Sequence, residues 1–170
     1  SFDSIFQALQ DLHTFAPLQA QNLAKHWFEK SNDALELIKE LVEKGDVFAQ
    51  RVLGWMLAKG KGTGKDPVKA EAWLSRASEQ GDLVARVYLA ELYEKVNRLK
   101  KAEKLLREVL GRIEVSHGSA HPLMGLAYHQ LARIYAASGR TDAAGLFYLK
   151  ALKIRESSLG TEHPEIGISL

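Results

Sequence analysis

The chain has 170 residues, 46% of them hydrophobic and 26% charged, which is the balance of a folded protein rather than a disordered one. Its 23 basic and 21 acidic residues leave a net charge of +2, so we expect no nucleic-acid partner. Cysteine is absent, which excludes disulfides and thiolate metal sites. No apolar run approaches the ~20 residues that span a bilayer, so we expect no membrane span. A cytoplasmic location is favoured, and a periplasmic or exported one is left open because a signal could have been removed.

Helix-favouring residues at three- and four-residue spacings fill most of the chain, and no segment alternates as a strand would. We therefore predict an all-α fold of about nine helices. The first 44 residues are expected to hold three of them, over residues 3–13, 17–29 and 33–44. The third repeats the apolar spacing of residues 70–77 at a distance of 36 residues. Residues 1–44 are thus interpreted as a degenerate repeat or a cap.

Two internal repeats follow. Gly45-Asp46 returns 36 residues later as Gly81-Asp82, and a shift of 42 residues links the next two segments. The 42-residue pairs are Ala85 and Ala127, Leu89 and Leu131, Ala90 and Ala132, Tyr93 and Tyr135, Arg98 and Arg140, Ala102 and Ala144, and Leu110 and Leu152. Small residues at Gly54, Ala90 and Ala132 would let a neighbouring helix approach closely. Helical hairpins of this kind cannot bury their apolar faces alone, so they must stack on one another.

The repeated residues carry a family resemblance. Residues 45–80 resemble a Sel-one-like repeat, with Leu53-Gly54, Gly60-Lys61-Gly62, Lys69-Ala70 and Trp73-Leu74 in its pattern. Residues 83–116 and 125–158 resemble tetratricopeptide repeats. The 42-residue step and the recurrence of Gly118-Ser119-Ala120-His121-Pro122 as Gly160-Thr161-Glu162-His163-Pro164 are similar to the kinesin-light-chain subtype.

This resemblance implies a right-handed superhelix of stacked hairpins, a solenoid that serves as a scaffold for a protein or peptide partner. It also implies a division of the chain beyond the N-terminal helices of residues 1–44. The expected parts are a Sel-one-like repeat at 45–82, tetratricopeptide repeats at 83–120 and 121–160, and the start of a further repeat helix at 161–170.

Three kinds of chemistry are considered and rejected. The run from Gly60 to Lys65 lacks the spacing of a phosphate-binding loop and follows a predicted helix, so its glycines are interpreted as shaping a loop. His117 and His121 do not share a helical face, because Gly118 lies between them and Pro122 starts the next helix. No nucleophile lies in a motif that would pair it with a base. We therefore expect no cofactor, no metal and no enzymatic activity.

The concave groove is the candidate binding site, because first helices of successive hairpins line it. Trp55 follows the small residue Gly54, a position that faces the groove in this superfamily, whereas Tyr148 is assigned to the core. The repeat phase predicts a groove that carries an aromatic side chain, several cations and an acid, suited to an extended or helical peptide. Its predicted residues are Phe48, Arg51, Trp55, Lys59, Val87, Glu91, Lys95, His129 and Arg133.

Two other roles are left open. The chain could be a structural spacer or a dimerisation segment of a longer protein, and a homo-oligomer could form through the terminal repeat. It could also be an accessory or regulatory domain of an enzyme or of a DNA-binding partner.

Overall fold

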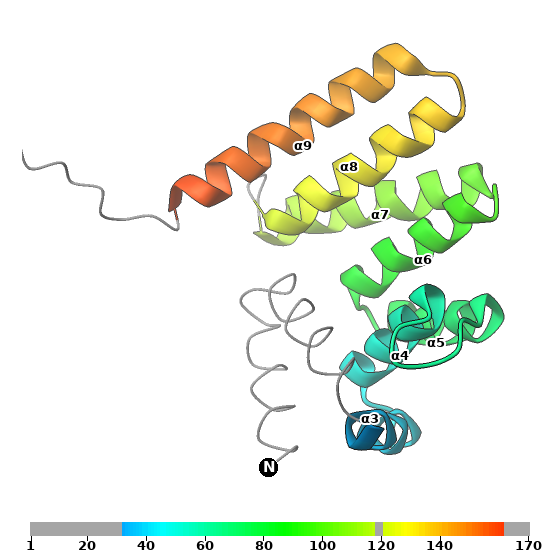
Figure 1. Ribbon diagram of the computed structural model, residues 1–170. Coiled ribbons are helices and arrows are strands. Elements are labelled where there is room, and N and C mark those ends of the chain that lie inside the picture. Colours follow the sequence, from blue (N-terminus) through cyan, green and yellow to red (C-terminus); the bar gives the residue numbers. More distant parts are fainter. Residues whose placement is uncertain (1–31, 118–120, 162–170) are drawn as a thin grey trace, which may run out of the picture. The chain divides into compact units, whose positions relative to one another are not determined.

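The computed structural model describes residues 32–117 and 121–161, which contain seven helices and no strand (Figure 1). The helices are α3 (Asn32–Glu43), α4 (Val47–Lys59), α5 (Pro67–Glu79), α6 (Leu83–Lys95), α7 (Leu99–His117), α8 (Pro122–Ala137) and α9 (Thr141–Thr161). The predicted all-α fold is confirmed, and so is the helix predicted over residues 33–44. The helices predicted over 3–13 and 17–29, and most of the repeat start predicted at 161–170, lie outside the described residues. No described helix combines the length and apolar character that crossing a membrane requires.

One turn geometry recurs between consecutive helices. Gly45, Gly81, Asn97 and Gly139 each have a left-handed backbone, with φ between +59° and +96°. Glycine adopts this conformation without strain, and asparagine is among the few other residues that tolerate it. In each turn the next N–H donates to the carbonyl five residues earlier, as in Asp82 N to Ala77 O at 3.0 Å and Arg140 N to Tyr135 O at 2.9 Å. The sequence repeats therefore correspond to repeats of one helix-ending motif.

Polar side chains mark where the helices begin. An aspartate before α4, α5 and α6 accepts from the backbone N–H three residues on, which satisfies a donor that has no partner within the helix. The pairs are Asp46 with Ala49 N at 2.7 Å, Asp66 with Lys69 N at 3.0 Å, and Asp82 with Ala85 N at 2.8 Å. His121 caps α8 through Nδ1, which accepts from Leu123 N at 3.2 Å, and Pro122 occupies the first turn of that helix.

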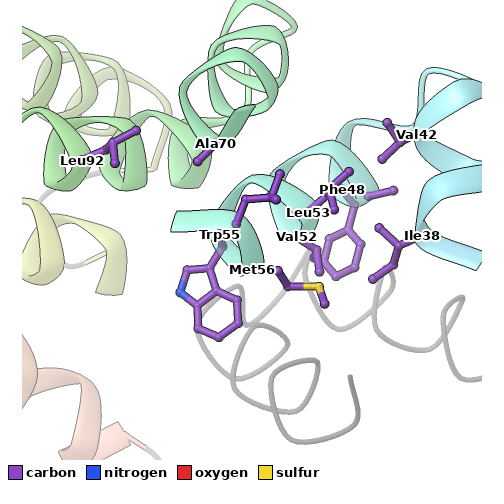
Figure 2. Close-up of a cluster of buried hydrophobic side chains, with 11 residues drawn as sticks. Ile38, Val42, Phe48, Val52, Leu53, Trp55, Met56, Ala70 and Leu92 are labelled. Carbon is purple, nitrogen blue, oxygen red and sulfur yellow. The ribbon is translucent and has the colours of Figure 1, made fainter. Parts of the chain in front are cut away.

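The chain divides into a first unit that ends at Leu92 and a second that begins at Tyr93. In the first unit α4 packs against both α3 and α5. Figure 2 shows the buried cluster that joins α3 and α4, with Ile38 and Val42 facing Phe48. Gly54 allows α5 to approach closely, because a Cβ atom there would lie 2.7 Å from Cγ of Leu74. The predicted packing role of this small residue is confirmed.

In the second unit α8 packs against α7 and α9 and lies between them (Figure 1). The Tyr135 ring of α8 meets the Phe147 ring of α9 edge to face, with centroids 5.0 Å apart. Gly125 of α8 lies close to α9, since a Cβ atom there would be 3.3 Å from Cγ2 of Ile154. The core of this unit therefore depends on small and aromatic residues of α8.

Glu103 of α7 holds this unit together through three donors. Its carboxylate accepts from Tyr135 Oη at 2.7 Å, from Arg107 Nε at 3.1 Å and from Arg140 Nη2 at 2.9 Å. Burial alone would raise the pKa of Glu103, but the hydrogen bonds from Arg140, Tyr135 and Arg107 outweigh it and lower the pKa to about 2. The Arg140 guanidinium also lies 3.8 Å from the centroid of the Tyr135 ring. One carboxylate thus connects α7, α8 and the turn before α9.

Candidate binding surface

Four of the predicted groove residues are buried in the first unit. Phe48, Arg51, Trp55 and Val87 all lie in the interior, and the exposed fraction of Trp55 is 5%. Figure 2 shows Trp55 projecting from the same side of α4 as Met56. These four side chains contribute to packing in this structure, and their predicted contact with a ligand stays a prediction.

The Arg51 side chain of α4 lies beside the start of α6. Its exposed fraction is 0%, its Nε lies 3.6 Å from Oδ2 of Asp82, and its guanidinium lies 4.7 Å from the centroid of the Phe48 ring. Burial lowers the pKa of Arg51, and the Asp82 carboxylate opposes that shift. Since Asp82 also caps α6, the Arg51–Asp82 pair links the two helices.

Lys59 and Glu91 pair with each other in the first unit. Nζ of Lys59, at the end of α4, lies 2.5 Å from Oε1 of Glu91 on α6. Both side chains are partly exposed, so the pair is within reach of solvent. The two charges of this pair offset each other, and the predicted contact of Lys59 and Glu91 with a ligand stays a prediction.

The remaining predicted residues, Lys95, His129 and Arg133, lie in the second unit and are here called the α8 surface. Lys95 is exposed at the end of α6, and His129 and Arg133 are partly exposed, one turn apart on α8. Nη2 of Arg133 lies 2.9 Å from Oε1 of Glu94. The Glu94 side chain is mostly buried, whereas 37% of the Arg133 side chain is exposed. The exposed part of the α8 surface is therefore cationic.

His129 adds an aromatic group to the α8 surface. Its ring meets the Tyr148 ring of α9 edge to face, with centroids 5.4 Å apart. Burial lowers the pKa of His129, and the nearby Arg155 and Arg133 lower it further. The imidazole is therefore neutral at pH 7, where it can donate or accept a hydrogen bond.

Glu94 is a residue of this surface that the sequence reasoning missed. The 42-residue shift relates it to Ala136 and the 36-residue shift relates it to Ala58, so no repeat equivalent points to an acid there. The available signal was its place one turn after Ala90, whose repeat equivalent Ala132 directly precedes Arg133. A charge pair between Glu94 and Arg133 could have been proposed from that placement.

The run from Gly60 to Lys65 connects α4 to α5, with left-handed φ angles of +70° at Gly60 and +71° at Gly62. It follows a helix and not a strand, as the sequence predicted. Across residues 32–117 and 121–161, no group of three or more histidine, aspartate and glutamate side chains is arranged to hold a metal ion.

Comparison with known families identifies the repeats. The tetratricopeptide repeat model matches residues 83–157, which include α6 to α8 and most of α9, and the Sel1 repeat model matches residues 18–34 and 47–82. Over these residues the chain is similar to tetratricopeptide and Sel1 repeats. The predicted resemblance is therefore confirmed, and repeats of these families generally mediate protein–protein interactions and are typically not enzymes. No curated protein matches the sequence.

Solved structures with the same fold include two of MamA and one of BtubC. A crystal structure of MamA is 22% identical, covers 94% of this chain and 91% of that chain, and has a TM-score of 0.59. A second MamA structure is 20% identical, covers 97% and 88%, and has a TM-score of 0.58. BtubC (BKLC) from P. vanneervenii is 16% identical, covers 99% and 75%, and has a TM-score of 0.66. At these identities the similarity shows the fold alone.

Proposed function

We propose that this chain is a protein-interaction module that binds an acidic peptide or protein segment on the α8 surface. One observation carries the proposal: Lys95 and Arg133 expose cationic groups where the neighbouring acid, Glu94, is mostly buried. A ligand therefore meets positive charge first. The repeat families support a binding role in general, and the charge of this surface supports the acidic character of the ligand.

Arg133 suits a carboxylate ligand because of how it is held. Glu94 contacts its Nη2 atom and fixes the direction of the guanidinium. A guanidinium carries five N–H donors in a planar fork, so a ligand carboxylate can approach its exposed part with two parallel hydrogen bonds. Because Glu94 already orients the guanidinium, the Arg133 side chain loses less conformational entropy when a ligand binds. His129 and Tyr148 provide an aromatic edge beside it for an apolar side chain of the same ligand.

A peptide selection tests this proposal without a known partner. The full chain is immobilised and a displayed random dodecapeptide library is selected on it, in parallel with an Arg133→Glu variant and an Arg112→Glu control. Arg112 is exposed on α7, outside the α8 surface. We expect the wild-type chain and the control to enrich peptides rich in aspartate and glutamate. The Arg133→Glu variant should lose that enrichment.

Two results would reject the proposal. One is the recovery of the same acidic peptides by the Arg133→Glu variant, with helicity preserved in circular dichroism. The other is a wild-type selection with no acidic enrichment. The alternative role as a spacer or dimerisation segment is favoured by a different observation, the exposed apolar side of α9.

A further inference from the structure

His129 of the α8 surface lies between two arginines. Arg133 follows it by four residues, so the two side chains lie one turn apart on the same side of α8. Arg155 belongs to α9, and its neighbour Ile154 packs at Gly125, one turn before His129. A Cβ atom at Gly125 would lie 3.3 Å from Cγ2 of Ile154. The order along α8 is therefore Arg155, His129 and Arg133, and we call these three residues the basic row.

The imidazole is the member of the basic row whose charge can change near neutral pH, because arginine stays protonated. Its ring meets the Tyr148 ring of α9 edge to face, with centroids 5.4 Å apart. His129 is partly exposed and 40% of Tyr148 is exposed, so the core position predicted for Tyr148 is wrong. The imidazole therefore packs on a neighbouring ring and stays within reach of a ligand.

The charges that act on the imidazole are positive. Burial lowers the pKa of His129, and Arg155 and Arg133 lower it further. The other residues one turn away on α8 and on the facing part of α9 are uncharged; they are Gly125, Leu126, Ala132, Ala144, Gly145, Ala151 and Leu152. On α6, Glu94 pairs with Arg133, and Lys95 adds a further cation. In the free protein, protonation of His129 is therefore disfavoured from both ends of the row.

An acidic ligand would change that balance. Carboxylates on Arg133 and Arg155 offset the two positive charges, and a third carboxylate accepts a hydrogen bond from the protonated imidazole. The pKa of His129 then rises when the ligand binds. Because linkage is reciprocal, a ligand that favours the protonated imidazole binds that form more tightly. Affinity is therefore lowest above the pKa of the bound state and increases as the pH falls toward the pKa of the free state.

The spacing of the basic row indicates the form of the ligand. Gly125, His129 and Arg133 are four residues apart, so successive groups of the row lie about 6 Å apart along α8 at 1.5 Å per residue. In an extended chain, side chains on one side recur every two residues, or about 6.4–6.8 Å. Acidic residues at alternate positions of an extended segment therefore match the row.

We infer that the ligand is an extended segment with acidic residues at alternate positions, that it spans Arg155 to Arg133, and that it binds more tightly in mild acid because His129 takes up a proton from solvent. This inference rests on the function proposed above, to which it adds the arrangement of the ligand and a regulation by pH. The binding surface thereby continues from α8 onto α9.

Fluorescence anisotropy with the full chain tests this at about pH 7.5 and about pH 5.5, at constant ionic strength. The probe is a peptide with three glutamates that alternate with serines, and glutamate stays ionised at both pH values. We expect the wild type to bind it roughly threefold or more tightly at the lower pH. His129→Gln should bind equally at both. His121→Asn removes another histidine and keeps a side chain that caps α8, so this matched control should respond as the wild type does.

Two further measurements examine the parts of the inference. Arg155→Gln should weaken the peptide roughly threefold, and an unchanged affinity would overturn the extension onto α9. In an NMR titration, the pKa of His129 should rise when the peptide saturates the chain. Circular dichroism of each variant checks that the helices are retained.

Failure of this inference is distinguishable from failure of the proposed function. Equal wild-type affinity at the two pH values, a pH response that His129→Gln retains, or a His129 pKa that the peptide leaves unchanged would overturn the inference alone. Absence of peptide binding at both pH values would overturn it too. Equally tight binding of a peptide with lysine in place of glutamate would overturn the proposed function and the inference with it.

Discussion

Gly54→Ala tests the close packing on which the first hairpin depends. The added methyl group would lie 2.7 Å from Cγ and 2.9 Å from Cδ2 of Leu74, and 3.2 Å from its backbone nitrogen. Leu74 is 0% exposed, so its side chain has no open space to move into. Overpacking of this kind costs about 1–3 kcal/mol. Alanine in place of glycine in a helix contributes about 1 kcal/mol in the opposite direction. We expect a net loss of up to about 2 kcal/mol in the free energy of unfolding.

Gly111→Ala separates the two contributions. Gly111 lies within α7, and a Cβ atom there would have no neighbour within 4 Å. This variant should therefore be more stable than the wild type by about 0.5–1 kcal/mol. Urea denaturation followed by circular dichroism measures both variants. A Gly54→Ala chain stabilised as much as Gly111→Ala would refute the packing argument. In a Leu74→Ala background the cost of Gly54→Ala should largely disappear, because the crowding atoms are removed.

Three further predictions concern stability and use the same urea denaturation. Glu103→Gln should lower the free energy of unfolding at pH 7 by about 1–2 kcal/mol, because it weakens three charge-assisted hydrogen bonds. The Glu103 contribution in the wild type is present above pH 4.5 and is lost as the pH falls toward its folded pKa of about 2, so the variant should depend less on pH in that range. Asp82→Ala should cost about 3–5 kcal/mol, because it removes both the α6 cap and the carboxylate beside the buried Arg51. Gly139→Ala should cost about 1–2 kcal/mol, since alanine is strained at a φ of +75°, whereas Asn97→Gly should cost nothing at the equivalent turn. Three results would each contradict the corresponding argument. The first is a pH dependence of stability that Glu103→Gln leaves unchanged, and the second is an Asp82→Ala chain as stable as the wild type. The third is an equal change in stability for Gly139→Ala and Asn97→Gly.

The sequence was sufficient for the helices and turns because their determinants are local. Gly45-Asp46 and Gly81-Asp82 combine a left-handed residue with a helix cap, and this chemistry places each turn within a residue or two. At one turn the glycine pattern is missing from the sequence, because Asn97 stands in place of glycine. It occupies the position of Gly139 in the 42-residue repeat and takes the same backbone conformation, but its identity differs.

Which of the groove residues are exposed was harder to predict from the sequence. Exposure depends on packing neighbours, and the spacing of the repeats does not specify them. The 36- and 42-residue shifts relate Trp55, Glu91 and Arg133 to one another, yet Trp55 is buried, Glu91 pairs with Lys59, and Arg133 is more than one-third exposed. The core position predicted for Tyr148 is wrong for the same reason. Its ring contacts His129 of α8, but 40% of the residue is exposed.

We propose that the α8 surface binds an acidic segment through Arg133. Isothermal titration of one selected acidic peptide into the wild-type chain, Arg133→Glu and Arg112→Glu tests it most directly. We expect Arg133→Glu to weaken binding roughly tenfold or more, while Arg112→Glu should bind as the wild type does. Equal affinity for the wild type and Arg133→Glu would contradict the claim.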